Sequence, residues 1–267
     1  MQEKQNNRPE RATLAAFARM ALSIAAILVA TTGNAPANLI TNGDFEGGET
    51  DGVPNGWNFD DAGEDGAEVL LDSSTVGESA FTSGSQSARL PDGDTDQQTL
   101  YQAFDPFAGQ LTFVFDFYLD DDVPKTAHWN AHLDGNDNQA FAYNIDHSDK
   151  GDDEDSQFTL VARGGDEAQD IVLDSETWYR VTTNLDTDTQ TFSGTIESTS
   201  EVIATIGSKT FQNEVTAVDQ VRFVDGYGGK ENSPLNIDNV SVIPEPASLM
   251  LLALGGVALL KRRPRRW

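Results

Sequence analysis

The sequence predicts an all-β fold, a two-sheet antiparallel β-sandwich over residues 38–243. Many short segments of this region carry apolar residues at every second position, and none keeps an apolar period of 3.6 residues. Clusters of Gly, Asp and Asn separate these segments, which is typical of two packed sheets joined by turns. The region has no Pro/Ser-rich linker and no repeat of fixed period, so we interpret it as one domain.

The clearest strand is Leu111–Leu119, where every odd position is apolar while Asp116 faces the other way. Trp178–Leu185 and Gln190–Ser198 flank Asp186-Thr187-Asp188-Thr189, and this arrangement predicts a hairpin. The other expected strands are Glu68–Asp72, Gln98–Phe104, Ala127–Leu133, Gln139–Ile145, Gln157–Ala162, Glu201–Ile206, Val221–Val224 and Leu235–Val242.

Composition excludes several classes of function. Residues 38–243 hold 8 Lys and Arg against 41 Asp and Glu, a net charge of −33. A polyanion of this density repels phosphate, so we expect no nucleic-acid partner. The chain has no Cys, which excludes disulfides, thiolate zinc sites and Cys nucleophiles.

The N-terminal segment has the features of a secretory signal peptide. Three Arg residues precede the apolar segment Ala21–Ala30, and Ala35-Pro36-Ala37 follows as an A-x-A cleavage site. Cleavage between Ala37 and Asn38 would remove residues 1–37. The alternative is a buried helix or membrane anchor, although ten apolar residues are too few to span about 30 Å of hydrocarbon.

The C-terminal residues 244–267 combine a short motif, an apolar helix and a basic cluster. Pro244-Glu245-Pro246 is followed by the apolar segment Ala247–Leu260 and then by five Lys and Arg residues. A helix of this length reaches about 21 Å, which is short for a full membrane span. The basic cluster favours the cytoplasmic side, and this orientation would leave residues 38–243 outside the inner membrane.

This ending resembles the PEP-CTERM sorting signal of exported proteins of Gram-negative bacteria, with Ile243 where that family often has Val. The resemblance implies an exosortase-type membrane protease as a partner, transient anchoring in the inner membrane through the C-terminal helix, and release to the cell surface or extracellular matrix. A simple C-terminal anchor is the alternative.

Two local resemblances concern the sandwich. Asn38–Glu46 with Pro54–Trp57, and the last strand Leu235–Val242, resemble galactose-binding-like carbohydrate-binding jelly rolls. Leu173–Val181 with Leu185–Thr189 is more similar to concanavalin- or laminin-G-type jelly rolls. Both families are lectin-like sandwiches, and the choice between them stays open.

The first of these resemblances implies a structural calcium ion where the first and last strands meet, held by Glu46 and Asp238. An independent feature of the sequence concerns the same place. The apolar parity of the last strand changes between Ile237 and Val240, which predicts a bulge that redirects Asp238 or Asn239. Backbone carbonyls or water would have to supply the remaining calcium ligands. The alternative is an edge strand with solvated carboxylates.

Aromatic side chains are the candidates for stacking on sugar rings. Of Trp57, Trp129, Tyr143 and Trp178, we select Trp129 and Tyr143 as exposed ligand-binding residues because polar neighbours flank both. For each of the four, packing in the core is the competing interpretation.

No catalytic motif is present, and His128 and His132 fall in a strand too far apart for one ion. The expectation is therefore an exported, non-catalytic protein that associates with extracellular polysaccharide. The alternatives are a carbohydrate-active hydrolase or lyase, whose two carboxylates could come from any of the 41 acidic residues, and a purely structural matrix protein.

The charge of residues 38–243 predicts that salt stabilises the protein. Like charges repel one another in the folded state, and about 0.15 M salt shortens the screening length to about 8 Å. Melting temperature should therefore rise when NaCl is added to a dilute buffer. A flat or falling curve would show that pairing or bound cations already neutralise the acidic residues.

Overall fold

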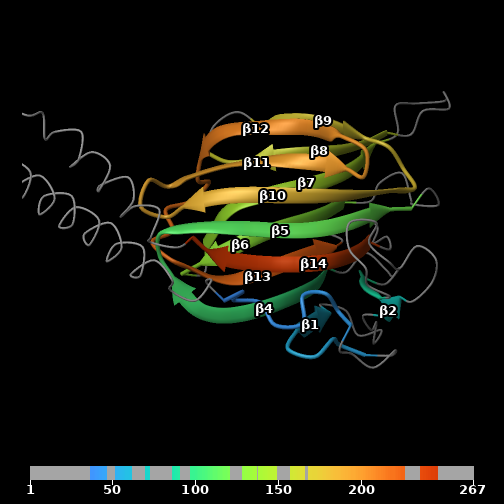
Figure 1. The fold of residues 1–267 in the computed structure, drawn as a ribbon, viewed down its shortest axis with the longest axis horizontal. Coiled ribbons are helices and arrows are strands. Elements are labelled where there is room, and N and C mark those ends of the chain that lie inside the picture. Colours follow the sequence, from blue (N-terminus) through green and yellow to red (C-terminus); the bar gives the residue numbers. More distant parts are fainter. Residues whose placement is uncertain are drawn as a thin grey trace, which may run out of the picture. The chain divides into compact units, whose positions relative to one another are not determined.

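Two seven-stranded antiparallel sheets pack face to face in this protein, as the computed structural model in Figure 1 shows. The structure describes residues 37–46, 52–61, 70–72, 86–90, 97–120, 128–136, 138–148, 157–165, 168–225 and 235–245. All strand pairs within these residues are antiparallel. The predicted two-sheet β-sandwich is therefore confirmed.

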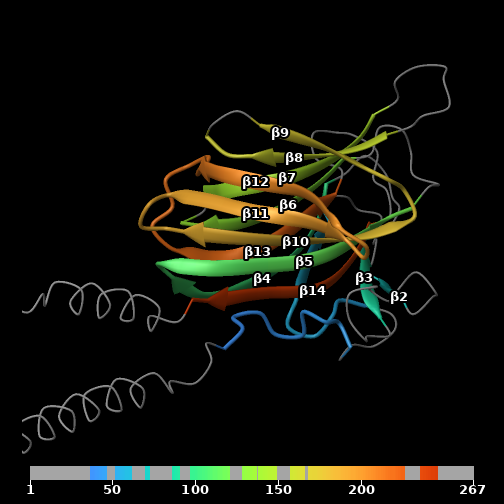
Figure 2. The same ribbon diagram turned by 45° about the horizontal axis from the view of Figure 1, so that its top comes forward.

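We name each sheet by its central strand. The β6 sheet contains, in spatial order, β1 (Asn58–Asp61), β4 (Gln98–Phe107), β13 (Val218–Asp225), β6 (His128–Gly135), β7 (Asn138–Ser148), β8 (Gln157–Arg163) and β9 (Gln169–Leu173). The β5 sheet contains β12 (Val202–Thr210), β11 (Thr191–Ser198), β10 (Thr177–Asp186), β5 (Gln110–Leu119), β14 (Leu235–Pro244), β3 (Ser87–Leu90) and β2 (Leu70–Asp72). Figure 2 shows how β3 and β2 continue the β5 sheet beyond β14.

Each expected strand corresponds to an observed one, and three further strands were not expected. These are β1, β3 and β9, all at or next to a sheet edge. Each is only four or five residues long, too short for an alternating pattern to stand out in the sequence. The hairpin between β10 and β11 is confirmed, and the Asp186 carboxylate accepts the backbone N–H groups of Asp188 at 2.8 Å and Thr189 at 3.2 Å.

Aromatic residues from both sheets fill the core. The five odd positions of Leu111–Leu119 are all buried, as the alternation predicts. Phe115 of β5 contacts Tyr143 and Phe223 of the opposite sheet, with ring centroids 6.1 and 5.4 Å apart. Phe141 stacks on Phe192 at 4.7 Å. Contacts between aromatic rings therefore join the two sheets. Each such ring pair stabilises the fold by about 1 kcal/mol in addition to the free energy gained by burying its apolar surface.

The expectation that Trp129 and Tyr143 are exposed is wrong. Their exposed fractions are 1% and 0%, so both belong to the core and neither can stack on a sugar. The reason is strand parity: Trp129 shares its face with Leu133, and Tyr143 shares its face with Phe141. Polar residues that flank an aromatic in a strand point to the opposite face and say nothing about its exposure.

Tyr143 carries the one polar atom of its ring deep between the sheets. Its hydroxyl lies 2.7 Å from the hydroxyl of Thr183, which is also fully buried. Burial raises the pKa of Tyr143 above the ordinary 10.0, although the hydrogen bond with Thr183 opposes the shift. Folding therefore favours the protonated phenol.

This raised pKa predicts a loss of stability at alkaline pH. Above about pH 10 the unfolded chain ionises the phenol while the folded chain keeps its proton, so the free energy of unfolding falls by up to about 1.4 kcal/mol per pH unit. Tyr143→Phe should make this decline shallower, measured by urea unfolding at several pH values. Thr183→Val keeps the phenol and should keep the steep decline; equal slopes in both variants would contradict the assignment.

Candidate functional site

A polar hollow lies on the outer face of the β6 sheet, away from the core. Strand β6 supplies its centre because its side chains alternate: Trp129, Ala131 and Leu133 point into the core, while Asn130 and His132 point outward. The two outward residues are nevertheless only 7% and 6% exposed, since side chains of the neighbouring strands surround them.

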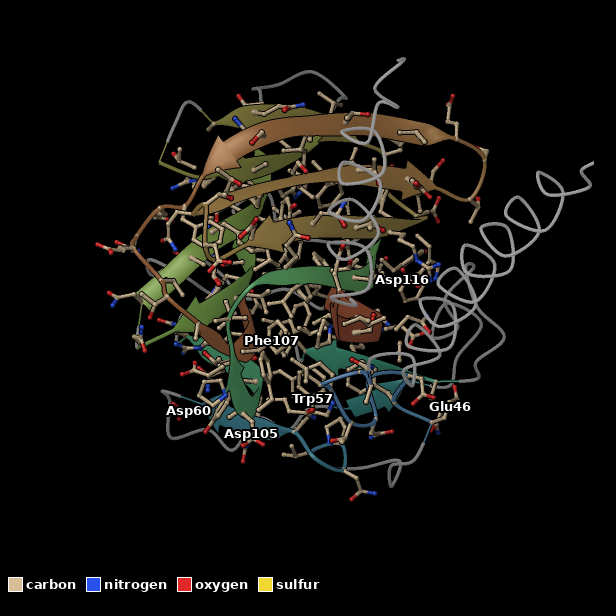
Figure 3. All side chains as sticks on the ribbon, turned by 60° about the vertical axis from the view of Figure 1, so that its left-hand side comes forward. Glu46, Trp57, Asp60, Asp105, Phe107 and Asp116 are labelled. Atoms are coloured by element: carbon tan, nitrogen blue, oxygen red, sulfur yellow. The ribbon has the colours of Figure 1, made fainter. Side chains whose placement is uncertain are left out.

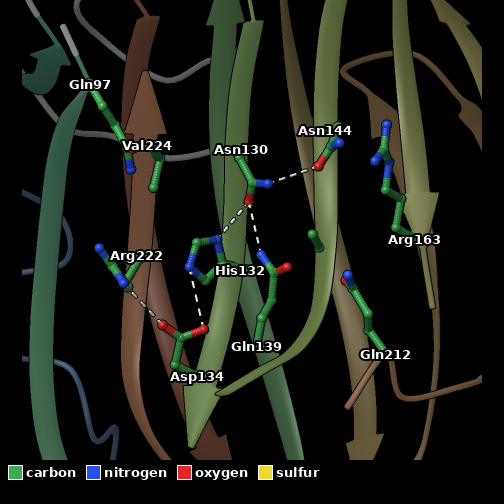
Figure 4. A pocket seen from close by; sticks show the side chains of 11 residues that line it. Gln97, Asn130, His132, Asp134, Gln139, Asn144, Arg163, Gln212, Arg222 and Val224 are labelled. Carbon is green, nitrogen blue, oxygen red and sulfur yellow. Dashed lines mark hydrogen bonds and ion pairs between the residues drawn. The ribbon is translucent and has the colours of Figure 1, made fainter. Parts of the chain in front are cut away.

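Strand register places residues of four strands around this hollow. Arg222 of β13 pairs with His132 of β6, His132 pairs with Ala142 of β7, and Ala142 pairs with Arg163 of β8. The small side chain of Ala142 leaves the space between larger neighbours, a hollow of about 250 Å³. Its walls are shown in Figure 4 and consist of Gln97, Asn130, His132, Asp134, Gln139, Ala142, Asn144, Arg163, Gln212, Arg222 and Val224.

A chain of polar contacts fixes one side of the hollow. The Asn130 amide lies 2.6 Å from His132 Nδ1, and His132 Nε2 lies 3.3 Å from Asp134 Oδ1. Arg222 Nη1 donates to Asp134 Oδ2 at 3.4 Å. The Gln139 amide approaches the Asn130 amide at 3.5 Å. Because each side chain is held by the next, the donors and acceptors of this wall have fixed directions.

The opposite side is formed by Asn144 and Arg163. The Asn144 amide lies between Arg163 and the Asn130 amide, which is 2.9 Å away. A guanidinium only donates hydrogen bonds, so we orient the Asn144 oxygen toward Arg163, where it accepts from Nε at 2.8 Å and Nη2 at 3.1 Å. The Asn130 amide is then turned as well, so that its oxygen accepts from the Asn144 NH2 group. The Arg163 side chain itself is exposed at the rim.

This wall composition is suited to hydrogen bonding with a polar ligand. The lining offers amide, imidazole and guanidinium groups, and its apolar members are the small Ala142 and Val224. Its one carboxylate is Asp134, whereas glycoside hydrolysis by the usual route needs two carboxyl groups about 5–9.5 Å apart. The residues that line the hollow therefore do not assemble that pair.

The sequence contained one signal for this site. In His128-Trp129-Asn130-Ala131-His132-Leu133-Asp134, polar and apolar residues alternate strictly, which predicts a polar row on the outer face. Nothing local indicated Arg163 or Arg222, because they reach the hollow only through strand pairing.

The first and last segments of the folded region meet, as the carbohydrate-binding resemblance implied. The N–H of Leu39 donates to the Val242 carbonyl at 2.8 Å, and the N–H of Val240 donates to the Gly43 carbonyl at 2.8 Å. The predicted bulge is confirmed, since the pairing of β14 with β5 shifts between Asp238 and Ser241.

Asp238 is 1% exposed, and Glu46 lies at the periphery of the sandwich in Figure 3. Asp238 Oδ1 accepts the Asn239 N–H at 2.7 Å, and Glu46 Oε1 accepts the Gln86 N–H at 2.9 Å just before β3. In the described residues, no three His, Asp or Glu side chains are arranged to hold a metal ion. Most calcium ligands would have to be carbonyls or water, and this site stays a prediction.

The outer face of the β5 sheet contains a second buried carboxylate beside Asp238. Asp116 is fully buried and pairs in register with both Asp238 and Arg180. Arg180 donates to both Asp116 oxygens, at 2.7 and 2.8 Å, and the Asn239 amide donates to one of them at 2.8 Å. This cluster joins β5, β10 and the bulge of β14, so we assign it a structural role.

The start of the C-terminal motif belongs to the sandwich. Strand β14 ends at Pro244, which pairs with Leu111, and the N–H of Glu245 donates to the Gln110 carbonyl at 2.8 Å. The folded unit accordingly extends to Glu245, two residues beyond the expected boundary at 243. Pro246 and the apolar segment Ala247–Leu260 lie outside the described residues, as does the expected signal peptide up to residue 36. The described residues contain no helix long and apolar enough to span a membrane.

Comparison with protein families decides what this ending is. Residues 242–266 match the PEP-CTERM protein-sorting motif. The chain carries this sorting motif. The predicted resemblance is confirmed, and the motif indicates export and sorting to the cell envelope or surface. No protein of curated function matches the chain in sequence.

Solved structures of similar shape are distant from this chain in sequence. A sialidase matches 72% of this chain with a TM-score of 0.49 and 13% identity, but this chain covers only 17% of the sialidase. A GH131 β-glucanase catalytic domain from Podospora anserina has a TM-score of 0.48 and 14% identity, over 67% of this chain and 79% of its own. A Lotus tetragonolobus seed lectin has a TM-score of 0.47 and 14% identity, over 72% and 95%. All three TM-scores are below 0.5, so the functional argument has to come from the chain's own residues.

The calcium prediction is testable through stability. An ion that binds only the folded chain stabilises it by about 2.7 kcal/mol at a hundredfold excess over its Kd. Calcium should therefore raise the melting temperature of the wild type and leave Glu46→Gln and Asp238→Asn unchanged. Glu201→Gln, in an exposed turn, removes the same charge and should keep the full calcium response. A response that survives in both site variants would contradict the site.

Proposed function

We propose that this exported protein binds extracellular polysaccharide through the hollow on the β6 sheet and does not cleave it. The observation that carries the proposal is the lining itself: amide, imidazole and guanidinium groups converge on a space of about 250 Å³ that Ala142 keeps open. This volume is below the range of about 300–1,000 Å³ typical of drug-sized ligands, so it suits a single small polar unit.

Sugar hydroxyls are the ligand chemistry that fits these groups. Each hydroxyl donates one hydrogen bond and accepts others, and an amide side chain does the same with its two ends. Asn130, Gln139 and Asn144 therefore match a ligand with several hydroxyls. The fixed network between Asn130, His132 and Asp134 lowers the entropy that binding would otherwise cost.

The number of carboxylates in the hollow favours binding over hydrolysis. Asp134 is engaged with His132 and Arg222, and no second acidic residue is among those that line the hollow. A purely structural matrix protein would have no need for a hollow with a buried, ordered polar wall. The sorting motif supports the same proposal, because sorting to the surface would bring the domain to extracellular polymers.

The motif also supports a proposal on processing. We infer that an exosortase-type protease handles the C-terminal segment after transient anchoring in the inner membrane, and that the signal peptide is removed before Asn38. The protein would then reach the cell surface or extracellular matrix without residues 1–37 and without its basic tail.

A steric block of the hollow tests the binding proposal. In full-length Ala142→Leu, the larger side chain should fill the space and lower the affinity for glycans bound by the wild type at least about tenfold, measured on a glycan array and by titration calorimetry. Ala103→Leu makes the same change on an exposed position of the β6 sheet outside the hollow, and should bind like the wild type.

Equal binding by Ala142→Leu would show that the sugar site lies elsewhere. Absence of any glycan binding by the wild type would favour the structural alternative. Release of new reducing ends from a bound polysaccharide would overturn the non-catalytic assignment.

A further inference from the structure

Two of the few basic residues of residues 38–243 meet at the hollow. Only 8 of these residues are Lys or Arg, against 41 Asp and Glu, yet Arg163 and Arg222 both line this one space. The lining contains a single carboxylate, Asp134. Two arginines and one aspartate therefore give the walls one excess positive charge, although the region around them is strongly acidic.

The two guanidinium groups differ in their partners. Arg222 is paired with Asp134, Nη1 to Oδ2 at 3.4 Å, so its charge is largely matched. Arg163 contacts the neutral amide of Asn144, and no carboxylate of the described residues lies within ion-pair distance of it. Among the described residues, the exposed Arg163 guanidinium at the mouth of the hollow therefore has hydrogen-bond donors but no carboxylate partner.

We propose that the hollow recognises a sugar unit that bears an acidic group, a carboxylate or a sulfate ester, and that Arg163 binds this group. This inference rests on the proposed carbohydrate-binding function and specifies its ligand class. A guanidinium presents parallel N–H donors that match the two oxygens of a carboxylate or sulfate, and such charged hydrogen bonds are about twice as strong as neutral ones.

The register sets the geometry of this recognition. Arg222, His132, Ala142 and Arg163 occupy one row across four neighbouring strands, so the backbones of the two Arg residues are about 14 Å apart. The space between them lies over Ala142. A sugar ring placed there would direct its hydroxyls at Asn130 and Asn144 and its acidic group toward the rim at Arg163.

The negative charge of the protein repels an anionic ligand, so the Arg163 contact in the hollow has to outweigh this repulsion. At about 0.15 M salt the screening length is about 8 Å, so distant carboxylates contribute little while a contact at about 3 Å is hardly screened. Binding should consequently be measured at physiological ionic strength, where the local Arg163 contact dominates.

The test compares three polymers on the full-length protein: polygalacturonate, the same polymer after chemical reduction of its carboxyl groups, and a sulfated galactan. The wild type should bind at least one of the two acidic polymers at least about tenfold more tightly than the reduced polymer. Arg163→Gln should lose this preference, so that it binds the acidic and the reduced polymers equally. Lys209→Gln removes the same charge on β12 of the other sheet and should retain the preference.

The outcomes separate this inference from the function on which it rests. Equal binding of acidic and reduced polymers by the wild type, sensitive to Ala142→Leu, would overturn the acidic-sugar proposal and leave carbohydrate binding intact. A preference for acidic polymers that persists in Arg163→Gln would overturn the role of Arg163. No binding to any of the polymers or to the glycan array would overturn both.

Discussion

Every strand of the sandwich has one face in the core and one face outside, and the rest of the structure depends on this alternation. Along β6, Trp129 and Leu133 pack between the sheets while Asn130 and His132 form the outer wall of the hollow. A slip of one residue would exchange the two sets. It would lose about 1.5–3 kcal/mol for each large apolar side chain exposed, and leave buried polar groups without partners at about 1–3 kcal/mol each. The packing of the core therefore fixes the positions of the polar groups on the opposite face.

The same alternation explains what the sequence could and could not predict. Period two is visible within nine residues, so Leu111–Leu119 and the fold class followed from local sequence. The alternation also places Trp129 and Tyr143 in the core, whereas their polar neighbours alone wrongly indicate exposure. The hollow depends instead on which strands lie side by side. Arg222 reaches Asp134 across 88 residues of sequence, through the pairing of β13 with β6, and no local pattern encodes that pairing.

Three arginines of this acidic region, Arg180, Arg222 and Arg163, occupy specific places. Arg180 makes two hydrogen bonds to Asp116, a carboxylate with no solvent exposure, and Asn239 adds a third. A buried carboxylate left without such a partner would destabilise the fold by several kcal/mol. Arg222 matches the charge of Asp134 in the same way on the opposite sheet. Arg163 departs from this pattern, because its contact is a neutral amide at the rim of the hollow. Because Arg180 and Arg222 each pair with a carboxylate, the position of Arg163 beside a neutral amide points to a role in ligand binding.

The two ends of the folded unit are joined through β14. Its residues 240–242 exchange hydrogen bonds with the segment that contains Leu39 and Gly43, and its far end holds the first residues of the sorting motif. Glu245 is attached to the sheet by a backbone hydrogen bond to Gln110, whose net contribution is about 1 kcal/mol. Releasing this last pair costs little, whereas releasing β14 as far as Val240 would break the contacts that close the sandwich at Leu39 and Gly43. Glu245 can therefore leave the sheet while the rest of the fold stays closed.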